Sequence, residues 1–240
     1  MPLIGIQLDA RASERLTVRQ RLGAFLDGLQ AQKLELQVSN QDGVMVIEGS
    51  DGFSYRVGGT PKLNAVVQYS FPIAEQRAAG VLPTIAYKPR AYGELLEVAS
   101  VRTREMIVAM SANGTVVKRL GAVATAQLAE HQLPAGGSAF KSWLEATWQA
   151  QGSSLIKTTS SVVVRFPRMP DTKFYEQCHH SFAFDVDADP REYVLMLDYQ
   201  RVWDESVATS VAMTALDGFL GCACTYFQEF GFPEEQWPPR

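Results

Sequence analysis

The residue types of a zinc site occur at two places in the sequence. Cys178, His179 and His180 are consecutive, and Cys222 and Cys224 lie two positions apart nearer the C-terminus. Structural zinc sites usually take pairs of ligands separated by about two to four residues. Neighbouring residues of a strand point to opposite faces, and residues two apart on a helix diverge. The spacing therefore favours a buried strand face and reduced thiols over a metal centre, and we expect no metal or cofactor.

Three other patterns resemble catalytic or ion-binding motifs without completing them. Glu130 beside His131 has the residue types of a general-base pair, but no serine or cysteine nucleophile sits in a recognisable turn. The glycine pairs at 58–59 and 136–137 lack the Gly-Lys-Ser/Thr of a phosphate loop. Carboxylates alternate at one strand end without the glycine and distal glutamate of a calcium loop: Asp185, Asp187 and Asp189. We interpret these patterns as turns and a solvated strand end, and we predict no catalytic residues.

Two expected strands near the C-terminus carry the residue types of a binding surface. Arginine and aromatic side chains on a sheet stack on nucleic acid, and they are also enriched at protein interfaces. The candidate binding residues are Lys157, Arg165, Tyr199, Arg201 and Trp203. The net charge of −4, from 22 basic and 26 acidic side chains, disfavours nucleic acid. The composition therefore favours a protein partner or self-association.

The elements that position these residues follow the hydrophobic pattern of the chain. An apolar strand at 3–8 precedes a helix with Ser13 as its expected N-cap and an apolar face from Leu16 to Leu29. Turn signals divide the next segment into an antiparallel meander with strands at 33–39, 44–48, 53–57 and 63–71. A proline-containing stretch leads to a helix at 92–110. The first half therefore combines one strand, one helix, four strands and a longer helix.

The second half repeats this order with one strand fewer. The pattern predicts a strand at 116–128, a helix at 139–151 capped by Ser138, and strands at 155–166, 174–186 and 193–203. Asp204 is the expected N-cap of a terminal helix at 205–230, and a polar tail follows at 234–240. That helix is apolar nearly all round, which indicates burial on more than one side. Its apolar surface belongs either to the core or to an oligomer interface.

The order of elements predicts an α+β fold with two pseudo-repeats of strand, helix, antiparallel strands and long helix. We expect a single domain with lobes at about 1–112 and 113–233, its helices packed on one face of a mostly antiparallel sheet. This order resembles the duplicated TATA-binding-protein fold, in which two halves form a curved sheet with helices on its convex side. The patches at 2–6, 119–123 and 195–199 are similar to a sporadically distributed family of uncharacterised prokaryotic proteins. That resemblance implies no assigned activity.

These features lead to one expected function and two alternatives. The first residues lack a signal-peptide pattern, and no apolar run reaches the ~18–20 residues of a membrane span, so we expect a cytoplasmic protein without membrane contact. We expect a non-enzymatic protein–protein interaction or assembly subunit of a bacterial complex. The first alternative is a nucleic-acid-binding module that uses the sheet face. The second is a small-ligand binder or enzyme with a pocket between the sheet and the long helix.

Overall fold

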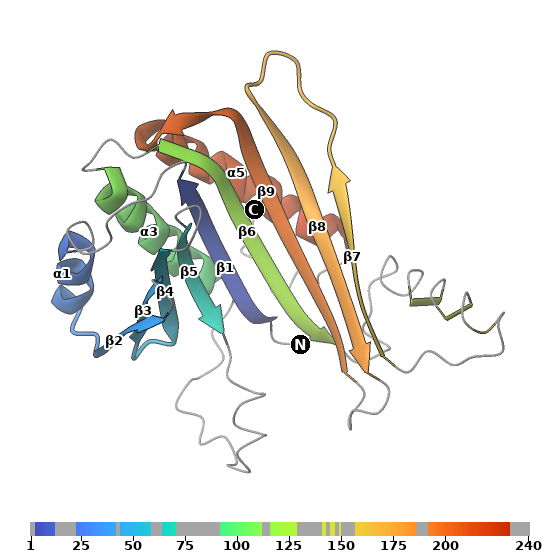
Figure 1. Cartoon of the computed structure of the whole chain (residues 1–240), viewed down its shortest axis with the longest axis horizontal. Helices are drawn as coiled ribbons and strands as arrows, with labels where there is room; N and C mark the ends of the chain where they lie inside the picture. The colour runs from blue at the N-terminus through green and yellow to red at the C-terminus, as the bar shows by residue number, and fades with distance from the viewer. Residues whose placement is uncertain are drawn as a thin grey trace, which may run out of the picture.

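The computed structural model describes residues 3–12, 23–41, 44–58, 64–70, 92–111, 116–128, 141–142, 145–146, 149, 157–185 and 192–230. Within these residues the fold is α+β, with one nine-stranded antiparallel sheet and three helices (Figure 1). Several predicted features lie outside the described residues: the caps Ser13 and Ser138, Glu130 and His131, Asp187 and Asp189, the second glycine pair, and the tail. The α+β prediction is confirmed.

The strands and helices are numbered in chain order. They are β1 (Leu3–Ala12), α1 (Gly23–Ala31), β2 (Leu36–Gln41), β3 (Val44–Gly49), β4 (Phe53–Gly58), β5 (Asn64–Ser70), α3 (Tyr92–Ser111), β6 (Val116–Leu128), β7 (Lys157–Arg165), β8 (Phe174–Asp185), β9 (Glu192–Ala208) and α5 (Thr209–Phe230). Across the sheet the strands run in the order β2-β3-β4-β5-β1-β6-β9-β8-β7. The predicted meander of four strands is therefore confirmed, and β1 and β6 lie side by side at the centre of the sheet.

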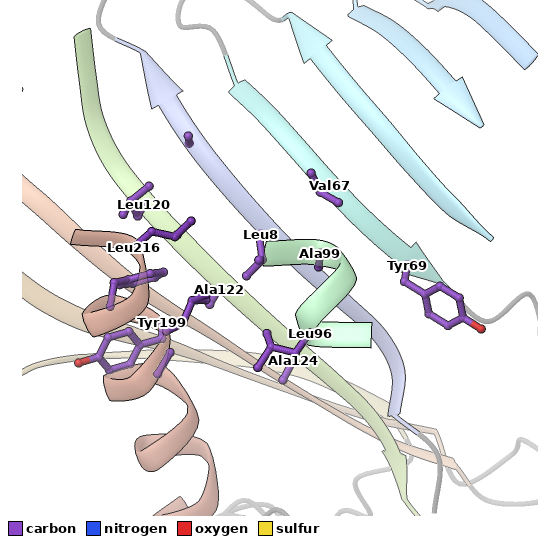
Figure 2. Packing of buried hydrophobic residues seen from close by; sticks show 14 of the residues in the cluster. Leu8, Val67, Tyr69, Leu96, Ala99, Leu120, Ala122, Ala124, Tyr199 and Leu216 are labelled. Carbon is purple, nitrogen blue, oxygen red and sulfur yellow. The ribbon is translucent and has the colours of Figure 1, made fainter. Parts of the chain in front are cut away.

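The core lies on the face of the sheet that α3 and α5 cover. Successive strand residues point to opposite faces, and the fully buried residues of the central strands, including Leu8, Leu120 and Ala124, all lie on this face. Helix α3 packs on β1 and β5, α5 packs on β6 and β9, and the two helices contact each other. Figure 2 shows Leu96 and Ala99 of α3 close to Leu8. The helices and this face of the sheet therefore form one continuous core.

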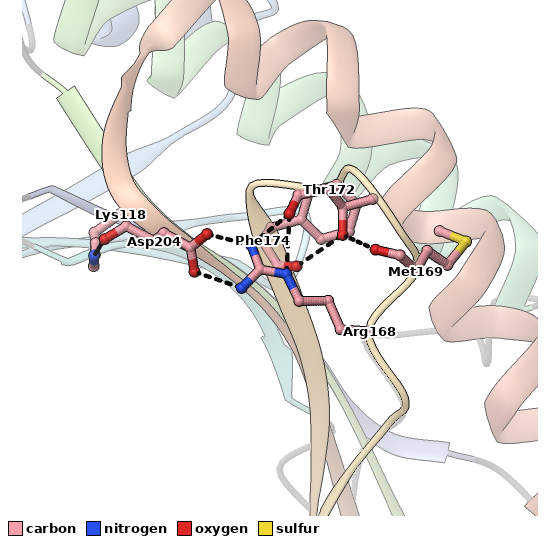
Figure 3. Close-up of polar contacts among 6 residues, drawn as sticks. All are labelled: Lys118, Arg168, Met169, Thr172, Phe174 and Asp204. Atoms are coloured by element: carbon pink, nitrogen blue, oxygen red, sulfur yellow. Dashed lines mark hydrogen bonds and ion pairs between the residues drawn. The ribbon is translucent and has the colours of Figure 1, made fainter.

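The terminal helix begins at Thr209, so the prediction that Asp204 caps it is wrong. Strand β9 continues past residue 203 because its ladder with β6 extends to the pair of Val116 with Ala208. Asp204 lies inside the strand, where its N–H donates to the Lys173 carbonyl at 2.9 Å. Its carboxylate pairs with Arg168, and its own carbonyl accepts a hydrogen bond from Lys118 Nζ at 2.7 Å (Figure 3). The cooperative strand ladder outweighs the local preference for a cap.

Helix α5 buries a single face, so the prediction of burial on more than one side is wrong. The buried side chains are those of Ala212, Leu216, Phe219, Leu220, Ala223 and Phe227. On the other side Val211 is 48% exposed, and Cys222 is also exposed. Phe219 and Leu220 of this face belong to the core, which is one of the two assignments that the sequence left open for this helix. The length and composition of α5 would also suit a membrane span, a criterion that the core helices of soluble proteins meet equally.

Candidate functional site

Three of the five candidate binding residues lie beneath α5. Tyr199, Arg201 and Trp203 occupy alternate positions of β9, as the sequence predicts, but they are only 4%, 8% and 4% exposed. Their face of β9 is the one on which α5 packs. The side chain of Lys157 lies outside the described residues. The periodicity of a strand defines its two faces, but the packing of α5 determines which face is covered.

The fourth candidate that the structure describes, Arg165, lies on the opposite face. It pairs with Gln177 of β8, which in turn pairs with Gln200 of β9. Directly paired residues share a face, and Gln200 lies between Tyr199 and Arg201 in the chain, so Arg165 points away from both. The candidate residues of β7 and β9 therefore do not form one surface. The sequence correctly assigned alternate residues of each strand to one face. Only the register between the strands shows that the face of β7 with Arg165 is not the face of β9 with Tyr199 and Arg201.

Beneath α5, Arg201 forms part of a buried polar cluster with Glu176 and Tyr199. Its Nη2 lies 2.6 Å and its Nε 2.8 Å from Glu176 Oε1. The Tyr199 hydroxyl donates to Glu176 Oε2 at 2.6 Å, and the guanidinium lies 4.4 Å from the centroid of the Phe174 ring. Burial, followed by the hydrogen bond to Glu176, raises the pKa of Tyr199. These contacts satisfy the charge of Arg201 inside the core, which is a structural role.

The space between the sheet and α5 is filled by aromatic rings in the part of the chain that the structure describes. The Tyr199 ring lies 5.9 Å from that of Phe219, 5.7 Å from that of Tyr226 and 6.5 Å from that of Phe227. Phe166 adds an edge contact to Tyr226 at 4.8 Å. These side chains occupy the region in which the second alternative placed a ligand pocket.

Cys178 and His180 of β8 lie on one face of the sheet and His179 lies on the other, as the sequence predicts. Cys178 is buried on the α5 side, and burial raises its pKa to about 12. His180 Nε2 lies 2.8 Å from the Tyr226 hydroxyl, whereas the adjacent His179 is on the other face. Among the described residues the three cysteines are free, and no cluster of histidine, cysteine and carboxylate side chains has the makings of a metal site.

A row of polar residues crosses the middle of the sheet on the face opposite α3 and α5. Its members are paired from strand to strand: Arg165 with Gln177, Gln177 with Gln200, Gln200 with Gly121, and Gly121 with Asp9. Asp9 and Gln200 are each only 3% exposed. The sequence alone did not predict this row, because the row depends on the register of four strand pairs. Polar residues at alternate positions of the first strand, Gln7 and Asp9, were the available signal.

Hydrogen bonds link the side chains of this polar row. Gln177 Nε2 donates to Gln200 Oε1 at 3.1 Å, and Gln200 Nε2 donates to Asp198 Oδ2 at 2.6 Å. Gln177 Nε2 also lies 3.0 Å from His179 Nε2. Arg119 Nη2 lies 2.9 Å from both carboxylate oxygens of Asp9. A carboxylate and a guanidinium buried together are stabilised only when they are paired in this way.

The glycine in the row makes room for the Asp9 carboxylate. A Cβ atom on Gly121 would lie 2.6 Å from Asp9 Oδ2 and 2.8 Å from Asp9 Cγ. We expect Gly121→Ala to displace Asp9 from Arg119 and to lower the free energy of unfolding by about 1–3 kcal/mol, as overpacking does. Urea unfolding measures this change. The control is Gly218→Ala on α5, where a new Cβ meets nothing within 4 Å; it should be neutral or stabilising. Equal effects would contradict the close contact.

Asp198 is the member of this region whose ionisation opposes folding. Burial raises its pKa, and the Asp9 carboxylate raises it further; Gln200, Arg119 and His179 act in the opposite direction. Its Oδ1 is buried and has no hydrogen-bond partner among the described residues. Because the folded state binds this proton more tightly than the unfolded chain, Asp198 favours folding at acid pH and destabilises the protein above its folded pKa.

We therefore expect Asp198→Asn to be more stable than the wild type at neutral pH. The asparagine oxygen can still accept the hydrogen bond from Gln200, and position 198 then carries no buried charge. The difference should shrink as the pH falls through about 4, because below that pH the wild-type side chain is protonated in the unfolded state as well as in the folded one. Thermal unfolding across this range measures it. Glu48→Gln, at an exposed position of β3, is the control. A difference that grows toward acid pH would contradict the assignment.

The most exposed apolar segment of the sheet lies on β7. Val162, Val163 and Val164 are consecutive and are 47%, 53% and 39% exposed. Strand β7 is the last in the sheet order, and its pairing with β8 runs from Lys157 to Arg165 without a bulge. Natural edge strands are usually short or protected by charge, proline or bulges. The opposite edge, β2, is shorter and exposes the single valine Val38.

The comparisons with known proteins leave the function to be inferred from this geometry. No protein-family model matches the chain, and no curated protein sequence matches it. The described sheet presents two unusual features: the polar row, whose members Asp9 and Gln200 are buried, and the β7 edge, whose valines are exposed. A partner reaches exposed residues directly, so the β7 edge is the better candidate for a binding site.

Proposed function

We propose that the protein is a non-enzymatic interaction subunit that binds another polypeptide by strand addition along β7. The observation that carries this proposal is the run of three exposed valines on a terminal strand. Val162 and Val164 lie on the α5 side of the sheet, beside His180 and Cys178, and Val163 lies on the other side, beside His179. An added strand would cover both faces of this run and pair its backbone, which is a common mode of peptide recognition.

The same geometry makes the nucleic-acid alternative less suitable. Tyr199, Arg201 and Trp203 are buried, so they offer no stacking platform. On the opposite face the guanidinium of Arg165 lies 4.3 Å from the centroid of the Tyr175 ring, and Arg119 is neutralised by Asp9. A nucleic-acid surface needs basic groups that are free to reach phosphates. These contacts therefore favour a polypeptide partner over a nucleic acid.

The proposal includes the two pseudo-repeats that the sequence predicts, with lobes at about 1–112 and 113–233. The strand order supports it: β1 lies beside β5, the last strand of the first meander, and β6 lies beside β9, the last of the second. A long helix follows each of these last strands. The arrangement also supports the likeness to the TATA-binding-protein topology. In this arrangement β7 is an outer strand of the second lobe, where it is open to a partner.

Substitution of Val163 by lysine tests the proposed function. A lysine on an edge strand blocks the addition of a further strand, and at a half-exposed position it should change the stability by less than about 0.5 kcal/mol. Native mass spectrometry of the protein purified from its host should show a complex for the wild type and for Val38→Lys, on the opposite edge. Val163→Lys should lack that complex. Identical complexes for all three proteins would contradict strand addition at β7.

A further inference from the structure

We infer that the strand bound by β7 is β7 of a second copy, paired antiparallel across a two-fold axis at Val163. This inference rests on the proposed strand addition and names its partner. It would join two nine-stranded sheets edge to edge through an isologous contact, in which the same residues contribute from both copies. Three features of the described residues carry it: the parity of the register, the distribution of charge along β7, and the position of Arg165.

The parity of the register limits where the two-fold axis can pass. Residues that lie opposite each other in an antiparallel pair have side chains on the same face of the sheet. A two-fold axis perpendicular to the sheet leaves α5 of both copies on the same side of the joined sheet. Residues on one face of a strand are an even number of positions apart, so only such residues can lie opposite each other. Such an axis must pass through a residue of β7. The choice is therefore among a few single-residue positions.

Charge and side-chain type select among these positions. An axis at Ser161 would pair the whole strand, but it would set Val162 against Ser160 and Val163 against Thr159 of the second copy, so these valines would not face one another. An axis at Val163 pairs Val162 with Val164 of the second copy, and Val163 with its own equivalent. In that register Arg165 faces Ser161. The Val163 axis gathers all the exposed valines as β-branched cross-strand pairs, which stabilise sheets, and brings no like charges together.

The position of Arg165 removes the charge that would otherwise protect this edge. Its guanidinium lies 4.3 Å from the centroid of the Tyr175 ring on β8, and its Nη2 is 3.4 Å from Gln177 Oε1. The side chain therefore extends toward β8 and away from the outer edge of β7. A charged residue that guards an edge strand instead projects where the next strand would bind. The segment from Ser161 to Val164 thus carries no charged side chain.

Cysteine cross-linking tests both the partner and the register. In a protein with Cys178→Ala, Cys222→Ser and Cys224→Ser, Val163→Cys should form a covalent dimer on mild oxidation; Cys178 is replaced because it lies directly opposite Val164 on β8. Opposite Cα atoms in antiparallel strands are about 4.5–5.5 Å apart, which suits a disulfide. Val162→Cys and Val164→Cys should dimerise poorly alone and efficiently as a mixture. Val38→Cys, on β2, is the control and should stay monomeric.

The outcomes separate this inference from the proposed function. If Val163→Cys stays monomeric but Val163→Lys still loses the native complex, the partner is a different protein; the second-copy inference is then wrong and the proposed function stands. If Val163→Cys stays monomeric and Val163→Lys keeps the complex, both are wrong. Equal cross-linking of Val38→Cys would indicate random collision and overturn the inference. Strong self-linking of Val162→Cys would place the axis at Val162 and overturn the register.

Discussion

Replacing Phe219 with alanine should lower the free energy of unfolding by about 3–5 kcal/mol, the usual cost of removing a buried phenylalanine. Phe219 is fully buried on the inner face of α5. Its ring lies 5.9 Å from that of Tyr199, and the guanidinium of Arg201 lies 5.7 Å from its centroid. The substitution therefore leaves a cavity above the centre of β9 and removes a cation–π contact. Such a loss is a large fraction of the total stability of an ordinary domain.

Urea unfolding at one fixed protein concentration measures this loss. A fixed concentration is needed because self-association would make the apparent stability depend on concentration. Val211→Ala is the matched control: it lies on the same helix, removes apolar atoms and is 48% exposed. Its effect should stay within about 0.5 kcal/mol. If the two variants unfolded alike, α5 would not be packed on the sheet through this face.

Replacing Glu176 with alanine should have a similarly large effect, about 3–5 kcal/mol, because it leaves a buried charge without its partner. Arg201 is 8% exposed and lies 2.6 Å from Glu176 Oε1 beneath α5. The same substitution removes the oxygen that accepts the Tyr199 hydroxyl at 2.6 Å. Two buried donors would then lack their acceptor at once. Thermal and urea unfolding should both report the loss.

A double substitution distinguishes the loss of the pair from the loss of one side chain. Replacing a whole buried ion pair with uncharged groups of similar size is often nearly neutral. We therefore expect Glu176→Gln combined with Arg201→Met to be more stable than Glu176→Gln alone, since no unpaired guanidinium remains. Together with Arg201→Met alone and the wild type, these variants complete a double-mutant cycle that gives the coupling energy of the pair. A double variant less stable than either single variant would show that each side chain contributes mainly through packing.

The sequence by itself determined the elements whose pattern is local. Residues 116–128 were predicted as a strand and form β6 with those bounds, and the helix predicted at 92–110 is α3, which ends one residue later. The meander from β2 to β5 followed from turn signals between short apolar runs, because neighbouring strands joined by tight turns pair with each other. Alternation also separated Cys178 and His180 from His179 correctly. In each case the deciding contacts lie close together in the chain.

Only the tertiary structure decided which faces are covered and which residues meet. The pairing of β1 with β6 joins segments far apart in the chain, and it sets Asp9 over Gly121. The ladder between β6 and β9 carried the strand past Asp204, and the packing of α5 buried Tyr199 and Arg201. Val162 to Val164 are exposed because the sheet order places β7 at its edge. Register and sheet order depend on contacts between distant segments, and the periodicity of one segment shows its two faces but not which strand lies beside it.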